Sequence, residues 1–188
     1  MIKGYLIHSD QTSDNRNQIV KEMTIGKGQK ALGFQFPKFK DTPLSFCSFY
    51  CKGYEGSFGP TGIIFETDEP VIYVAPADSL EFMREGRYLP EYEQFVFKSI
   101  EDMLKKYPTS LDFKKDFLEY FKKLNPREVY PHKSPKDARD EHETDYVMWD
   151  RNWLNLTQNN EVTFKKPTKV KSIKIFNSKN ELRAQCPL

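Results

Sequence analysis

The sequence has few cysteines and no long hydrophobic run, and each shortage excludes a class of protein. Its three cysteines, Cys47, Cys51 and Cys186, are too few for a disulfide framework. No run of 18 apolar residues is present, and the opening segment MIKGYLIHSD lacks the apolar core of a signal peptide. We therefore expect a soluble, reduced, cytoplasmic protein that does not bind membranes.

Charge of one sign is also scarce, because 29 Lys and Arg face 27 Asp and Glu for a formal net charge of +2. This balance gives no global field that would draw the protein onto nucleic acid or anionic lipid. The chain contains no P-loop and no G-x-G-x-x-G, G-x-S-x-G or H-E-x-x-H motif. Cys47 and Cys51 have no further Cys or His nearby to complete a zinc site, so we expect them to be buried as small apolar side chains.

Aromatic residues are abundant, with 15 Phe, 10 Tyr and 2 Trp among 188 residues. This content is enough to build a hydrophobic core. Because the sequence has no repeat and no low-complexity linker, we expect a single domain over residues 1–188.

The hydrophobic periodicity changes from strand to helix and back along the chain. A helical insert is expected at about 78–124, with an apolar stripe that begins at residue 91 and a later helix capped by Ser110. The expected strands lie at 3–8, 44–50, 62–66, 71–75, 144–149, 160–165 and 169–176. This order favours an α+β fold with an antiparallel or mixed sheet.

The last predicted strand interleaves lysines with apolar residues. Lys169, Lys171 and Lys174 alternate with Val170 and Ile173. The lysines could form a strip for nucleic acid, but the solvated face of an edge strand is the better interpretation, because lysine on an edge discourages aggregation.

Two places carry side chains that suit a functional site. In the acidic segment 140–145, Glu141, Glu143 and Asp145 share one face of an extended chain. Such a cluster could steady a developing positive charge, act as acid and base, hold a divalent metal, or form a solvated turn. His8 ends the opening strand, where it could bind a ligand or simply bond to the backbone.

Several short segments occur in a characteristic order: DTPLS at 41–45, YEG at 54–56, GIIF at 62–65, PVIYV at 70–74 and DEHE at 140–143. Together they resemble the AbiGi-type abortive-infection family, which is described as antitoxin-like. The order of parts also resembles the wider ADP-ribosyltransferase-like fold, including DarT-type toxins. That resemblance implies a split, mixed or antiparallel sheet core with a helical insert.

The resemblance also implies roles for side chains around a bound NAD. His8 would bind a ribose, and Tyr50 or Tyr54 would stack on the nicotinamide. Ser45, in the segment that matches the family, would contribute to the same cofactor-binding site. No resident metal is implied.

A glutamate on a late strand is the catalytic carboxylate in the proteins that the chain resembles. Glu143 is the first candidate for that role, Glu161 is the second because it also precedes a strand, and Glu141 is the third. The implied function is NAD-dependent ADP-ribosylation of a protein or nucleic acid in bacterial or phage conflict, as in toxin–antitoxin systems. The alternative is an inactive, antitoxin-like module that binds a partner protein.

Overall fold

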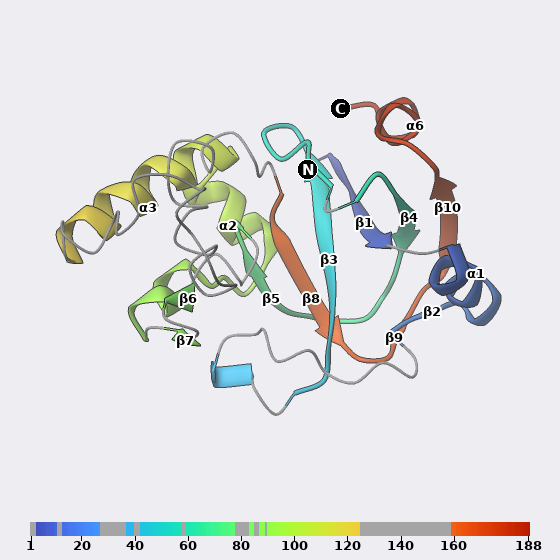
Figure 1. The fold of residues 1–188 in the computed structure, drawn as a ribbon, viewed down its shortest axis with the longest axis horizontal. Helices are drawn as coiled ribbons and strands as arrows, with labels where there is room; N and C mark the ends of the chain where they lie inside the picture. Colours follow the sequence, from blue (N-terminus) through green and yellow to red (C-terminus); the bar gives the residue numbers. More distant parts are fainter. Residues whose placement is uncertain are drawn as a thin grey trace, which may run out of the picture.

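A computed structural model describes residues 3–10, 13–26, 37–39, 42–57, 59–77, 83–84, 87–88, 90–124 and 159–188 (Figure 1). The elements before the helical insert are β1 (Gly4–Asp10), α1 (Ser13–Glu22), β2 (Thr24–Ile25), η1 (Pro37–Phe39), β3 (Leu44–Cys51), β4 (Thr61–Glu66) and β5 (Val71–Ala75). The insert contains β6 (Met83–Arg84), β7 (Arg87–Tyr88), η3 (Pro90–Phe95), α2 (Ile100–Lys106) and α3 (Ser110–Leu124). The last elements are β8 (Glu161–Lys165), β9 (Thr168–Lys169), β10 (Ser172–Phe176) and α6 (Lys179–Gln185).

Six strands form the main sheet in the order β10-β4-β1-β3-β8-β5, and every pairing between them is antiparallel. Strands from the first and last parts of the sequence are neighbours in this sheet: β8 pairs with β3, and β10 pairs with β4. Two small sheets, β2-β9 and β6-β7, accompany the main one. The predicted α+β class with an antiparallel sheet is therefore confirmed.

The pairing register assigns each side chain to one of two faces. Paired residues share a face and neighbours along a strand alternate. Ile7 pairs with Ser48, and Phe46, which lies two residues before Ser48 and so on the same face, pairs with Thr163. Glu161 lies two residues before Thr163 on β8, so it also belongs to this face. We call this the Glu161 face. The opposite surface, which carries His8 of β1 and residues such as Cys47, Phe49 and Val162, is the His8 face.

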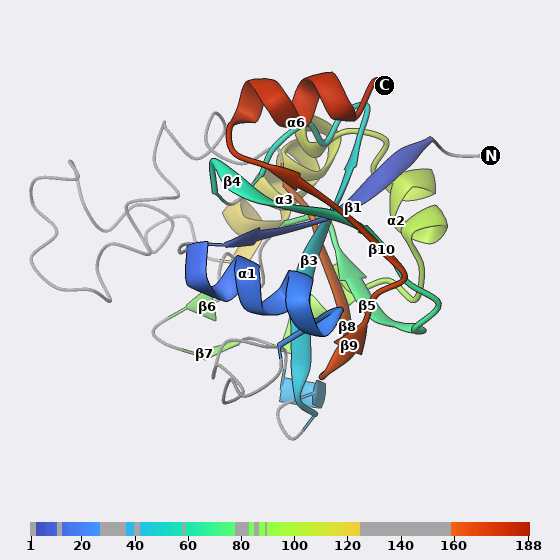
Figure 2. The same ribbon diagram turned by 90° about the vertical axis from the view of Figure 1, so that its right-hand side faces the viewer.

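Helices cover both faces of the sheet. Ile19 of α1 and Met103 of α2 are buried in the apolar cluster of the His8 face. On the Glu161 face there are two clusters, one around Leu182 of α6 and one around Phe113 and Phe117 of α3. Figure 2 shows α6 and α1 on opposite sides of β10, β4 and β1. The stripe residues of the insert whose side chains the structure describes, such as Met103, Phe113 and Phe117, are therefore core contacts.

One helix of the insert is shorter than the sequence predicts. The apolar stripe from residue 91 indicates continuous helix, but a 3-10 helix ends at Phe95 and α2 begins only at Ile100. Between them, Phe97 pairs with Val74 at the edge of β5 through backbone bonds of 2.8 and 2.9 Å. The helical prediction is therefore wrong here, because Phe97 completes the hydrogen bonds of an edge strand instead.

The cap of α3 also differs from the prediction by one residue. The hydroxyl of Thr109, not that of Ser110, accepts a bond of 3.2 Å from the Asp112 backbone N–H. The Asp112 carboxylate in turn accepts a bond of 3.0 Å from the Thr109 backbone N–H. This reciprocal pair is a capping box, which satisfies two donors at the start of the helix.

The strand predicted at 169–176 is interrupted, and its second half, β10, lies at the edge of the sheet as expected. Gln185 of α6 donates to the Ile175 carbonyl at 2.8 Å, which occupies one acceptor of that edge. Such a blocked edge resists pairing with another chain.

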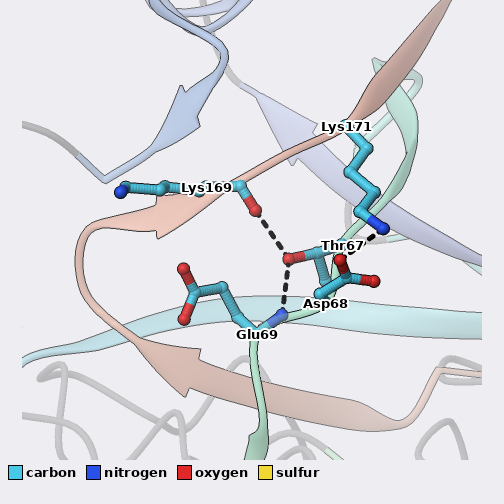
Figure 3. Close-up of polar contacts among 5 residues, drawn as sticks. All are labelled: Thr67, Asp68, Glu69, Lys169 and Lys171. Atoms are coloured by element: carbon cyan, nitrogen blue, oxygen red, sulfur yellow. Dashed lines mark hydrogen bonds and ion pairs between the residues drawn. The ribbon is translucent and has the colours of Figure 1, made fainter.

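Near β9, two of the lysines lie among carboxylates (Figure 3). The Thr67 hydroxyl donates to the Lys169 carbonyl at 2.6 Å and accepts from the Glu69 N–H at 3.0 Å. Lys171 forms an ion pair with Asp68, and both side chains are largely exposed. Because Asp68 and Glu69 lie beside Lys169 and Lys171, the nucleic-acid interpretation of the lysine strip loses support.

Within the described ranges, no helix combines the length and the apolar composition that crossing a membrane requires. The strand predicted at 144–149 lies outside the described residues.

Candidate functional site

The start of β8 places a carboxylate in the protein interior. Glu161 is the first residue of β8 and is only 3% exposed. Its Oε1 accepts a hydrogen bond of 2.6 Å from the hydroxyl of Tyr73 on the neighbouring strand β5. Because burial of a carboxylate costs free energy unless hydrogen bonds compensate, this bond stabilises and orients Glu161.

Among the described residues, several buried polar atoms without partners lie on or next to strands of the main sheet. Cys47 pairs with Val162, so the next residues in the antiparallel register, Ser48 and Glu161, lie side by side on the Glu161 face. Ser48 is 2% exposed, and its Oγ has no hydrogen-bond partner among the described residues. The same is true of Asn159 Oδ1 and Ser9 Oγ within that part of the chain. Buried polar atoms are nearly always paired, so we expect water or a ligand to bind them.

Asn160 holds the backbone immediately before Glu161. Its side chain accepts a bond of 2.8 Å from the Phe49 N–H and donates one of 2.9 Å to the Phe49 carbonyl. The carboxamide thus replaces the main-chain ladder between β3 and β8 at this point, and it is fully buried. We infer that Asn160 fixes where β8 begins and so positions Glu161.

Aromatic rings border this polar group. Phe39 of η1 stacks on Tyr73 with ring centroids 4.8 Å apart. Phe46 is half-buried and lies on the Glu161 face, paired with Thr163. The Thr163 hydroxyl bonds to both the N–H and the carbonyl of Tyr73, which holds that residue where the register of β5 shifts. The arrangement is a fixed carboxylate beside hydroxyl groups and aromatic rings.

His8 does not share a face with Glu161. Its Nδ1 lies 2.9 Å from the Phe46 carbonyl and 4.0 Å from the Cys47 sulfur, on the His8 face. The structure therefore places the sheet between the two side chains. A bond to the backbone was the second of the two roles that we expected for His8 from the sequence, and the contact with the Phe46 carbonyl is of that kind.

The nearby Cys47 and His8 do not make a nucleophilic pair. Burial raises the pKa of the Cys47 thiol, and the Glu161 carboxylate raises it further. A thiol that stays protonated is a poor nucleophile. Cys47 and Cys51 are each 2% exposed, which confirms their predicted role as small core residues.

The other predicted NAD-binding residues are dispersed. Tyr50 is 2% exposed and packs against α6 on the Glu161 face. Tyr54 is 1% exposed on the other side, where its hydroxyl donates to the Tyr107 carbonyl at 3.1 Å. Ser45 is buried and donates to the Ile25 carbonyl at 3.3 Å. The structure does not bring these three side chains together around one ligand.

Glu143 and Glu141, the first and third candidates for the catalytic carboxylate, lie outside the described residues. Over the part of the chain that is described, no group of three or more His, Cys, Asp or Glu is placed to hold a metal ion. Glu161 is therefore the candidate carboxylate whose surroundings the structure shows.

The sequence did not identify Ser48, Tyr73 or Asn160 as site residues. The sequence does contain one indication for Ser48. Among Leu44, Phe46, Ser48 and Tyr50, which alternate along the predicted strand and share one face, Ser48 is the single small polar residue. A hydroxyl on an otherwise apolar strand face is a buried polar group that requires a partner. No comparable signal pointed to Tyr73 or Asn160.

The buried thiols predict a loss of stability in alkaline solution. Burial raises the pKa of the Cys51 thiol from 9.0 to about 11, and the nearby Glu55 carboxylate adds to this effect. Burial also raises the pKa of the Cys186 thiol from 9.0 to about 11, although the nearby Lys174 lowers it. Between these pH values the unfolded chain loses thiol protons that the folded chain keeps. The free energy of unfolding should therefore fall as pH rises from about 9 to 11, by about 1 kcal/mol per thiol at pH 10.

Urea unfolding at pH 7, 9 and 10 would measure this effect, with the double variant Cys51→Ala/Cys186→Ala as the comparison. The variant should be less stable at pH 7 because cavities form, but its stability should fall less steeply with pH. Equal slopes for the two proteins would contradict the prediction.

Comparison with known proteins gives no independent assignment of this site: no protein-family profile, curated protein or solved structure matches the chain.

Proposed function

We propose that the protein binds NAD on the Glu161 face and cleaves its nicotinamide–ribose bond, as an ADP-ribosyltransferase-like enzyme of bacterial or phage conflict. The observation that carries the proposal is the buried Glu161 carboxylate, held by Tyr73 and placed beside the Ser48 hydroxyl, which has no hydrogen-bond partner among the described residues. The position of Glu161 at the start of a late strand agrees with the family resemblance of the sequence.

The proposed reaction breaks the bond between ribose C1′ and the nicotinamide nitrogen. Nicotinamide leaves with the bonding electron pair, and positive charge develops on C1′ and the ring oxygen. A carboxylate fixed nearby stabilises that charge, and does so more strongly in a buried site than in water. A nucleophile on the target then bonds to C1′ and releases its proton, which gives ADP-ribosylated target, nicotinamide and one proton.

The alternative is an antitoxin-like module that keeps the fold without the chemistry and binds a partner protein. Such a module would need an exposed surface for its partner, for example an aromatic patch on the helical insert. Phe95, Tyr107, Phe113 and Phe117 of the insert are instead buried in one cluster. These four described rings form no exposed patch, so they do not favour this alternative over the enzyme.

Calorimetric titration with NAD, combined with an assay for released nicotinamide, tests the proposal. Saturable binding and steady release would support it, and ADP-ribose should then compete with NAD. Absence of both binding and release would contradict it and leave the partner-binding alternative, which a pull-down would examine next. Binding without release would assign the Glu161 face to nucleotide recognition alone and reject the cleavage step.

A further inference from the structure

A cavity lies away from the Glu161 face. Its volume is about 480 Å³, within the range of small-molecule sites. It is bordered by the start of β1, the turn after β3, α2 and the last residue of the sequence. The lining residues are Lys3, Cys51, Lys52, Glu101, Leu104, Lys105, Pro108 and Leu188. Cys51 and Leu104 belong to the apolar cluster of the His8 face, so this cavity is separate from the site proposed above.

Hydrogen bonds and a glycine fix the walls of this cavity. Gly53 has φ +87°, and a Cβ atom there would lie 2.7 Å from the Pro108 carbonyl, so only glycine lets the two segments approach. The Ser110 N–H donates to the Gly53 carbonyl at 3.0 Å, and the Tyr54 hydroxyl ties the same turn to Tyr107. The turn after β3 and the end of α2 are therefore held together without a ligand, and this wall of the cavity is pre-formed.

The lining combines apolar surface with positive charge. Cys51, Leu104, Pro108 and Leu188 supply apolar atoms. Lys3, Lys52 and Lys105 are exposed, and their side-chain charges outnumber the one acidic side chain, Glu101. Lysine stems commonly cover apolar surface while the ammonium group stays in water. The cavity thus combines apolar walls with three exposed lysine side chains.

We propose that this cavity binds a small anionic amphiphile, a single-chain carboxylate whose apolar tail lies against Leu104 and Pro108 and whose head group meets the lysines. The argument is charge complementarity. A neutral apolar molecule would form no ion pair with the lysine ammonium groups, and a hydrophilic anion would make no apolar contact with the walls. Decanoate is a suitable probe because it combines both features.

Isothermal titration with decanoate, below its micelle concentration, tests the proposal. The protein should bind it saturably, and more tightly than the neutral 1-decanol. The double variant Lys52→Glu/Lys105→Glu should weaken decanoate binding by about tenfold or more, because two attractive charges become repulsive. The matched control is Lys174→Glu/Lys179→Glu, which makes the same charge change at exposed residues of β10 and α6 and should leave the affinity unchanged.

Three results would overturn the proposal: no saturable binding of decanoate, equal affinity for decanoate and 1-decanol, or equal affinity of the Lys52→Glu/Lys105→Glu variant and the wild type. Because both lysines are exposed, the variant should fold normally, and circular dichroism would verify this. The result does not depend on whether NAD binds.

Discussion

Glu161→Gln will reduce the release of nicotinamide from NAD by about a hundredfold or more. Glutamine keeps the size of the side chain and an oxygen that can accept the hydrogen bond from Tyr73. It lacks the negative charge that stabilises the positive charge developing at ribose C1′. The substitution therefore removes a stabilisation made mainly in the transition state, and kcat should fall much more than NAD affinity.

Steady-state release of nicotinamide and calorimetric binding of NAD would separate these two effects. Glu66→Gln is the matched control, because Glu66 is an exposed glutamate at the end of β4 and should not affect either quantity. Glu143→Gln provides the decisive comparison, since Glu143 is the first candidate from the sequence for the catalytic carboxylate. Loss of activity in Glu143→Gln with full activity in Glu161→Gln would reject Glu161 as the catalytic group.

Tyr73→Phe would show how far the geometry of the carboxylate matters. Removal of the hydroxyl leaves Glu161 without its 2.6 Å donor, and the carboxylate is then less well oriented. We expect a smaller loss of kcat than in Glu161→Gln, with NAD affinity largely kept, because the negative charge remains but is less precisely placed. An unchanged kcat would limit Tyr73 to a structural role.

The strands of this protein were predictable because their signals are local. Alternating or continuous apolar residues identified β3, β4, β5 and β8, and the lysine pattern identified β10 as an edge. The break between η3 and α2 was not predictable in the same way. The apolar stripe continues through this segment in the sequence, but the backbone of Phe97 pairs with Val74, and that contact depends on the position of β5 in the sheet.

The candidate site depends almost entirely on contacts between distant parts of the chain. Tyr73 and Glu161 are separated by 88 residues, and Phe49 and Asn160 by 111. Only the strand order and register place Ser48 beside Glu161, and a shift of one residue would turn one of them to the other face. The same register explains why His8 does not reach Glu161. The resemblance of the sequence was enough to make Glu161 a candidate, but the residues that surround Glu161 become evident only in the folded structure.

Asn160→Ala should lower the free energy of unfolding by about 2–4 kcal/mol, which is a large share of the stability of an ordinary domain. Alanine removes both bonds to Phe49 and leaves the N–H and the carbonyl of that residue without their partner. Urea unfolding would measure the loss, and hydrogen exchange at the Phe49 amide would locate it. Asn180→Ala, at an exposed position of α6, should change stability by less than about 0.5 kcal/mol.

Asn160→Asp separates the shape of the side chain from its hydrogen bonds. Aspartate can still accept from the Phe49 N–H, but when ionised it cannot donate to the Phe49 carbonyl, and it adds a buried charge next to Glu161. Burial should raise the pKa of this aspartate in the folded protein above its unfolded value of about 4. The variant should then be nearly as stable as the wild type below about pH 4 and should lose stability relative to it as pH rises. If Asn160→Asp instead matched the wild type at pH 7, the two bonds to Phe49 would not hold β8 in place, and Asn160 would not position Glu161.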